Sequence, residues 1–202
     1  MFLFRRLILT SILTIHRPIM TSSSSQSVGI IDLILSEHKY MRDEYEYFKS
    51  VKDLTKLDTR IRQWIAYIAL HGHKEEIAFY PKIESYLDDG KKDGHHIIKH
   101  GIKEHRELET ELKKLVEQSP MEWKQICKAV DRLVHHLNEE ESDILNPLRS
   151  KLNDKFQLEL AQQFIAAGQL ASDKPHPELS KKPEETPQEN INVGLAEKHQ
   201  DF

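Results

Sequence analysis

Residues 71–81 read His-Gly-His-Lys-Glu-Glu-Ile-Ala-Phe-Tyr-Pro, and this stretch decides how the rest of the chain is interpreted. Its first residue, His71, lies four positions before Glu75. Side chains four positions apart on an α-helix lie one above the other on the same face, so this imidazole and this carboxylate can bind one metal ion. Such pairs also occur on solvated helix faces, and one copy leaves both interpretations open.

A second copy of this spacing occurs later in the chain. His136 and Glu140 are again four positions apart, and Pro147 follows them as Pro81 follows the first pair. Internal self-similarity of this kind indicates a repeated structural unit. The repetition therefore favours metal binding over a chance pairing on a wet helix face.

The duplication extends upstream of each pair. His38 lies 33 residues before His71, and His105 lies 31 residues before His136. Each half therefore predicts a helix with one histidine, followed by a helix with His-x-x-x-Glu. Together the two halves offer six candidate metal ligands: His38, His71, Glu75, His105, His136 and Glu140.

Four segments carry apolar residues at the three- and four-residue steps of amphipathic helices, and no segment shows the alternation of a β-strand. The candidate ligands fall within these apolar stripes. His38, for example, lies between Ile34 and Met41. Four helices with short connections predict an all-α, up-down-up-down four-helix bundle over residues 27–150.

The helical register also separates the candidate ligands from neighbouring histidines. It places His136 on the inner face and His135 on the solvent face, and it leaves His73 on the flank of its helix. His100 likewise points away from the apolar stripe that holds His105. We therefore expect these neighbours to lie outside the metal site.

The chain beyond the bundle predicts two further regions. An amphipathic pattern predicts a C-terminal helix over residues 151–171, which either extends the fourth helix past Pro147 or packs back on the bundle. Residues 172–202 are rich in Pro, Glu, Lys, Asn and Gln and poor in apolar residues. We therefore expect a disordered tail there.

Residues 1–26 have the composition of a targeting segment. No acidic residue precedes Asp32, while arginine and serine are frequent. This composition predicts a mitochondrial transit peptide, with a secretory signal as the rival interpretation. Translation from Met20 would instead give a cytoplasmic protein. The apolar run of residues 7–13 is too short to span a membrane.

The bulk composition limits the classes of partner. The 202-residue chain carries a net charge of −4 with both signs interspersed, so we expect no nucleic-acid partner. Its single cysteine, Cys127, rules out an intramolecular disulfide. No particular protein partner is indicated.

The ligand types narrow the choice of metal. Imidazoles with carboxylates suit iron, zinc, manganese or copper, whereas calcium and magnesium prefer oxygen ligands. Each half offers two histidines and one carboxylate, the ligand set of open non-haem iron sites, and Glu75 and Glu140 could bridge two ions. We therefore expect two iron ions, with zinc or manganese as alternatives, and open positions that face dioxygen, another small diatomic molecule or peroxide.

With these motifs identified, residues 28–150 resemble the hemerythrin-like, HHE cation-binding domain. The most specific pieces are residues 71–76 with 79–81, and residues 135–141, His-His-Leu-Asn-Glu-Glu-Glu. The resemblance implies a four-helix bundle with a non-haem di-iron centre. The ligands that it implies are His38, His71, Glu75, His105, His136 and Glu140.

Three departures from the oxygen carriers of that family matter. The carriers place a further histidine one turn before the third-helix ligand, where this chain has Gly101. They also use a longer step in the last helix, which points to Glu141 instead of Glu140. The second copy has eleven residues from histidine to proline where the first has ten. We therefore expect sensing or handling of oxygen or iron and not reversible oxygen transport.

These features favour a protein that binds or senses oxygen or iron over an enzyme. One alternative is an oxidoreductase that acts on peroxide, nitric oxide or ferrous iron, and another is a metal-free helical interaction scaffold. Residues around the ligands should orient the imidazole rings. The candidates for this role are Glu37, Glu104, Tyr45 and Glu76.

Overall fold

The computed structural model describes residues 28–51, 53–88, 90 and 93–175. The predicted targeting segment, residues 1–26, lies outside this part of the chain, as does most of the predicted disordered tail, residues 176–202. All regular elements within the described residues are helical. None of these helices combines the length and the apolar character that a membrane crossing requires.

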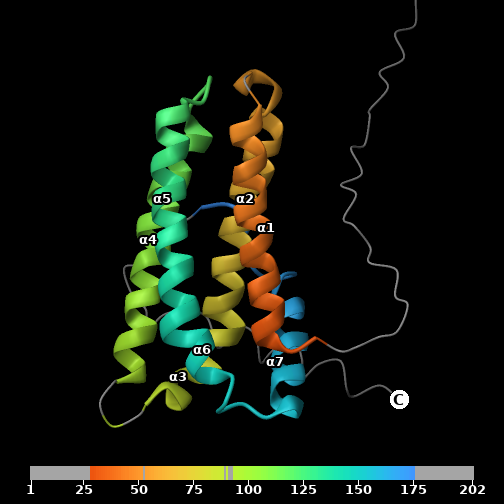
Figure 1. The fold of residues 1–202 in the computed structure, drawn as a ribbon, viewed down its shortest axis with the longest axis vertical. Helices are drawn as coiled ribbons and strands as arrows, with labels where there is room; N and C mark the ends of the chain where they lie inside the picture. Colours follow the sequence, from red (N-terminus) through yellow and green to blue (C-terminus); the bar gives the residue numbers. More distant parts are fainter. Residues whose placement is uncertain (1–27, 52, 89, 91–92, 176–202) are drawn as a thin grey trace, which may run out of the picture.

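Four long helices form the bundle that is labelled in Figure 1. They are α1 (Ile30–Ser50), α2 (Asp58–Lys74), α4 (Gly94–Glu117) and α5 (Trp123–Glu140). A short 3-10 helix, η1 (Leu54–Lys56), joins α1 to α2. Helix α2 contacts α1 and α4, and α5 contacts α4 and α1, which closes the bundle. The predicted all-α, up-down-up-down four-helix bundle is confirmed.

Both α2 and α5 continue past the bundle through a π-helical turn. The turn η2 (Glu75–Phe79) leads from α2 into α3 (Tyr80–Leu87). The turn η3 (Glu141–Leu145) leads from α5 into α6 (Asn146–Leu148). In both turns the residue directly before the proline donates its backbone N–H to the carbonyl five positions earlier.

The two prolines explain these wide turns. Inside a regular α-helix, proline has no N–H to donate and its ring clashes with the carbonyl four positions earlier. A π turn inserts one extra residue and moves that carbonyl away from the ring of Pro81 or Pro147. The prolines therefore widen these helices and do not end them.

A last helix, α7 (Asp154–Ala167), packs back on the bundle against α1 and η2 (Figure 1). It begins where the side-chain oxygen of Asn153 accepts the backbone N–H of Phe156, which satisfies one of the free donors at the helix start. Of the two arrangements that the sequence leaves open for the C-terminal helix, the structure shows this one.

The apolar core is divided into two clusters by a polar layer. The first cluster lies toward η1 and includes Phe48, Trp64 and Leu112. The second lies toward α7 and includes Phe79 and Phe164. Each bundle helix, counted together with its π turn, contributes to both clusters, and its candidate ligands lie between the two. The fold therefore holds the predicted site at one level of the bundle.

Loss of the α7 contact should destabilise the protein. The ring of Phe164 is fully buried, so Phe164→Ala is expected to lower the free energy of unfolding by about 3–5 kcal/mol. The next residue, Ile165, is 64% exposed, and Ile165→Ala should change that free energy by less than about 0.5 kcal/mol. Urea denaturation followed by circular dichroism measures both values. Equal effects of the two substitutions would contradict the packing of α7 described here.

Candidate metal centre

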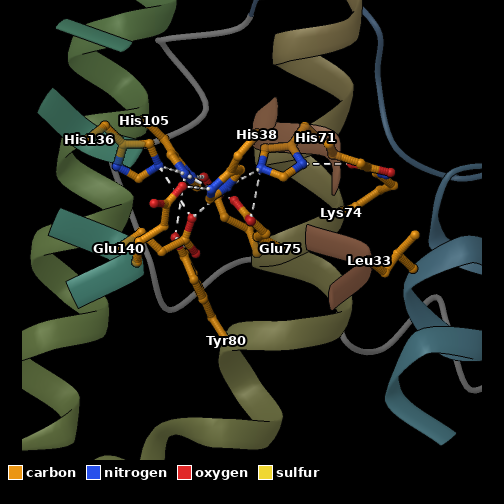
Figure 2. A network of polar contacts seen from close by, with 12 residues as sticks. Leu33, His38, His71, Lys74, Glu75, Tyr80, His105, His136 and Glu140 are labelled. Carbon is orange, nitrogen blue, oxygen red and sulfur yellow. Dashed lines mark hydrogen bonds and ion pairs between the residues drawn. The ribbon is translucent and has the colours of Figure 1, made fainter. Parts of the chain in front are cut away.

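The six candidate ligands converge in the polar layer. They come from α1, α2, the start of η2, α4 and α5, and each is at most 4% exposed: His38, His71, Glu75, His105, His136 and Glu140. Figure 2 shows the imidazole rings and the two carboxylates pointing toward one another from the surrounding helices. The helical register therefore brings all six side chains to one place.

The imidazoles face each other in two pairs. Nε2 of His38 lies 3.1 Å from Nε2 of His71, and Nε2 of His105 lies 2.9 Å from Nε2 of His136. One pair comes from the α1–α2 hairpin and the other from the α4–α5 hairpin. All four Nε2 atoms therefore point into the layer, and all four Nδ1 atoms point outward.

A carboxylate lies against each outer nitrogen. The Nδ1 distances are 2.7 Å for His71 to Glu37, 2.8 Å for His105 to Glu76, 2.9 Å for His38 to Glu141 and 3.1 Å for His136 to Glu104. An ionised carboxylate can only accept a hydrogen bond, so each Nδ1 carries a proton. When the ring is neutral, it presents the lone pair of Nε2 inward, which is how metal-binding histidines are oriented in proteins.

These supporting contacts follow the duplication of the sequence. Glu37 and Glu104 each precede a candidate histidine, and each supports the other imidazole of its own hairpin. Glu76 and Glu141 each follow an inner glutamate, and each supports an imidazole of the opposite hairpin. Neither half alone therefore supports both of its own imidazoles.

Three of the four oxygens of the two inner carboxylates are approached, among the described residues, by imidazoles alone. Oε1 of Glu75 lies 3.0 Å from Nε2 of His71, and its Oε2 lies 3.4 Å from Nε2 of His105. Oε2 of Glu140 lies 3.2 Å from Nε2 of His38. Apart from these imidazole contacts, none of these three oxygens has a hydrogen-bond partner among the described residues. Because a buried carboxylate without compensation costs several kcal/mol, a bound cation would stabilise this arrangement.

The inward donor atoms form two groups. Those of His38, His71, Glu75 and Glu140 lie within 4.8 Å of one another, and so do those of Glu75, His105 and His136. Glu75 belongs to both groups and turns one oxygen toward each imidazole pair. A set of imidazole and carboxylate donors suits iron, zinc or manganese. The residues present therefore fit a pair of transition-metal ions.

Permanent positive charges hold three of the four outer carboxylates. The pairs are Lys74 with Glu37 at 2.6 Å, Arg42 with Glu141 at 2.7 Å, and Arg106 with Glu76. Glu104 differs, because its ion-pair partners among the described residues are all histidines. Three of the four outer carboxylates are therefore neutralised by a lysine or an arginine, whereas Glu104 is paired only with histidines among the described residues.

Burial and charge act in opposite directions on the imidazoles. Burial lowers the pKa of His71, but Glu75 and Glu37 outweigh it and raise that pKa to about 9. Burial also lowers the pKa of His105, which Glu75 and Glu76 raise to about 10. For Glu75, burial raises the pKa, yet the two imidazoles hold it well below its usual range. Without a metal, protons on these rings therefore compensate Glu75 at neutral pH.

Tyr80 adds a hydroxyl that the sequence analysis missed. Its Oη donates to Oε1 of Glu140 at 3.1 Å and lies 3.4 Å from Nε2 of His105. Burial and the charge of Glu140 raise the pKa of Tyr80 well above its usual value, so the hydroxyl keeps its proton. A Cβ at Gly101 would lie 3.3 Å from this hydroxyl. The hydroxyl therefore lies beside the position at which the resemblance places a further histidine in oxygen carriers.

The two sides of the site differ in how closely other residues shield them from solvent. On the α4–α5 side, a cleft of about 590 Å³ leads past Gly101 to His136 and Glu140. On the opposite side, the ring of Phe164 from α7 lies 6.1 Å from the ring of His71 and 4.1 Å from Nζ of Lys74. Within the described residues, the α4–α5 side is therefore the open one.

The neighbouring histidines lie where the register predicts. Nε2 of His73 lies 2.6 Å from Glu109, outside both donor groups. The side chains of His100 and His135 are 52% and 61% exposed. Helical register alone therefore distinguished inner from outer histidines.

Of the residues expected to orient the rings, Glu37, Glu76 and Glu104 do so, whereas the prediction for Tyr45 is wrong. Oη of Tyr45 lies 3.9 Å from Sγ of Cys127, and its ring packs on the first apolar cluster. Tyr45 is two helical turns, roughly 10 Å, beyond His38, which places it at a different level of the bundle.

Glu140 and Glu141, between which the sequence leaves the ligand open, have different surroundings. The Glu140 carboxylate points inward, while that of Glu141 lies behind His38 and is 27% exposed. The hydrogen bond from His38 is the main reason that the pKa of Glu141 falls to about 2. The geometry therefore favours Glu140 as the inner donor and gives Glu141 a supporting position.

Comparisons with known proteins indicate one domain family for most of the described chain. The model of the hemerythrin HHE cation-binding domain matches residues 29–148. An uncharacterised hemerythrin-like protein of Schizosaccharomyces pombe is 27% identical over 164 residues, which are 79% of each chain. A DNA nickase of a Nostoc species is 24% identical over 152 residues, 72% of this chain but only 40% of that protein. No solved structure gives a significant match.

Metal binding should release protons. The raised pKa values of His71 and His105 keep both rings protonated at pH 7 in the metal-free protein, and a metal ion binds only the deprotonated nitrogen. Addition of Fe²⁺ or Zn²⁺ to the metal-free protein is therefore expected to release about two protons per chain, and affinity should fall as the pH is lowered. Titration in a weakly buffered dye solution measures the release. Binding without proton release would contradict the assigned donors.

Proposed function

Because this chain belongs to the hemerythrin HHE cation-binding domain family, we propose that its polar layer holds two iron ions and binds or senses oxygen or iron. Zinc and manganese are the alternative metals, since the donor types suit them too. The proposed ligands are His38, His71, Glu75, His105, His136 and Glu140.

The observation that carries this proposal is a set of buried carboxylate oxygens whose close polar neighbours, among the described residues, are imidazoles alone. The oxygens of Glu75 and one oxygen of Glu140 lie among four Nε2 atoms, and apart from these imidazoles the described residues offer them no hydrogen bond. A protein that used the layer only for stability would gain by pairing or replacing such groups. Their persistence at the centre of the core supports a bound cation.

When bound, a pair of iron ions would supply redox chemistry and open positions for a small ligand. The chain itself fixes the donors. The outer carboxylates set the tautomer and the direction of each ring, and the ion pairs behind them hold those carboxylates in place. The apolar clusters above and below the layer keep water from reaching it along the bundle axis.

The surroundings of Gly101 support sensing or iron handling over reversible oxygen transport. Gly101 offers no ligand atom, and the hydroxyl of Tyr80 lies beside it. The cleft reaches this place from the α4–α5 surface, so a small molecule has a route to Glu140 and His136. The open side of the site therefore suits an exchangeable ligand.

Tyr80 also supports a second candidate function, an oxidoreductase that acts on peroxide, nitric oxide or ferrous iron. Its protonated hydroxyl donates to Glu140, a proposed ligand at the inner end of the cleft. A positioned hydroxyl of this kind can supply a proton to a reacting molecule. Binding alone does not require such a donor.

Iron content tests the leading proposal. Tag-free protein loaded with Fe²⁺ under anaerobic conditions is expected to hold about two iron ions per chain. Glu75→Ala should reduce the ratio below about one, because Glu75 contributes to both donor groups. Metal analysis with protein quantification measures the ratio.

His73→Ala is the matched control for iron content. His73 lies two residues from His71 but outside both donor groups, so this variant should keep the wild-type ratio. Circular dichroism confirms that each variant is folded. Less than about one iron ion per wild-type chain would refute the proposal.

Turnover tests the second candidate. If the Tyr80 hydroxyl delivers a proton, Tyr80→Phe should lower the rate with peroxide or nitric oxide by about 10²–10⁴-fold and leave the iron content unchanged. Stopped-flow absorbance on the iron-loaded protein measures the rate. Equal, slow rates in the wild type and the variant would leave binding or sensing as the function.

A further inference from the structure

The mouth of the cleft carries a second group of metal-binding side chains. Donor atoms of His100, Glu104 and Glu139 lie within 4.8 Å of one another. Nε2 of His100 is 2.9 Å from Glu139 and 4.0 Å from Glu104. Nε2 of His135 approaches the same two carboxylates at 3.2 Å and 3.4 Å. Two carboxylates therefore face two imidazoles at the surface.

The duplication shows what is unusual about this group. In the first half, the residue three positions after His71 is Lys74, and its ammonium neutralises Glu37 at 2.6 Å. In the second half, the residue three positions after His136 is Glu139. Glu104 corresponds to Glu37. Glu37 lies beside a lysine, whereas Glu104 lies beside a second glutamate. Among the described residues, no lysine or arginine pairs with Glu104.

The cleft connects this group to the buried centre. It is lined by His100 and Glu139 at the surface, then by Glu104, and by His136 and Glu140 at its inner end, and none of the described residues that line it is a lysine or an arginine. Glu140 lines this route and is only 2% exposed, so the route ends at a buried carboxylate. Acidic walls of this kind concentrate cations.

We propose that His100, Glu104 and Glu139, with His135 beside them, form an outer divalent-cation site that delivers metal ions to the buried centre. The delivery role rests on the proposed function of that centre. Imidazole with carboxylate suits a transition metal such as Fe²⁺. Partial exposure of His100 and Glu139 makes the outer site weaker and faster to exchange than the buried one.

Glu104 links the two sites. One of its oxygens lies 3.1 Å from Nδ1 of His136, a proposed ligand of the buried centre, and 4.0 Å from Nε2 of His100. A cation at the mouth would supply the charge that Lys74 supplies in the other half. On the opposite side, Lys74 itself supplies that charge and packs against the ring of Phe164.

Charge reversal at position 139 tests this inference. Glu139→Lys reproduces the arrangement of the first half, and His100→Ala/Glu139→Gln removes two donors while Glu104 remains. His95→Ala/Glu84→Gln is the control, because it removes an exposed imidazole and carboxylate that lie 3.2 Å apart outside the donor groups. Equilibrium dialysis of the metal-free, full-length protein against Co²⁺ counts the bound ions. Rapid mixing with Fe²⁺ under anaerobic conditions gives the loading rate.

Wild-type protein should bind about two Co²⁺ ions tightly and about one more weakly. Both outer-site variants should lose only the weak ion and load Fe²⁺ at least about tenfold more slowly, to the same final content, while the control matches the wild type. Unchanged weak binding and unchanged loading in both outer-site variants would overturn the proposal.

A further variant separates this proposal from the one on which it rests. His71→Ala/Glu75→Ala should lose the tight ions and keep the weak one. A wild-type chain that binds only the weak ion, lost in Glu139→Lys, would refute the buried centre and the delivery role but would support the outer site.

Discussion

The carboxylates of Glu75 and Glu140 are buried, and the groups around them must compensate their negative charge. They lie between two apolar clusters, where an uncompensated charge costs several kcal/mol. The imidazoles around Glu75 can neutralise it only by holding protons, and its charge raises the pKa of both His71 and His105. A divalent cation would replace these protons with a stronger attraction. The electrostatics of the polar layer therefore favour a bound cation.

Beyond the imidazoles, charge alternates outward through the bundle. Each inner ring is backed by a carboxylate, and three of these carboxylates are backed by a lysine or an arginine. Such chains keep every buried charge next to an opposite one and fix the rings in one orientation. Because Glu76 and Glu141 each reach the opposite hairpin, the two hairpins depend on each other for a complete site.

Sequence periodicity was sufficient to predict the bundle and to select the inner histidines. The i,i+4 spacing and the apolar stripes fix which face of each helix turns inward, and the burial of His136 beside the exposed His135 follows from this alone. Contacts across the π turns could not be predicted in this way. The inward hydroxyl of Tyr80 depends on the extra residue that η2 inserts, and the support of His38 by Glu141 depends on where η3 begins.

The small differences between the two halves carry as much meaning as their likeness. The first half has Lys74 and the cover of α7, so its outer face is neutral and closed. The second half has Glu139 at the matching position, and a cleft lies beside it, so its outer face is acidic and open. A strictly symmetric bundle would give ions and ligands two equal routes or none. The lysine of one half and the glutamate of the other therefore leave the two outer faces of the layer different in charge.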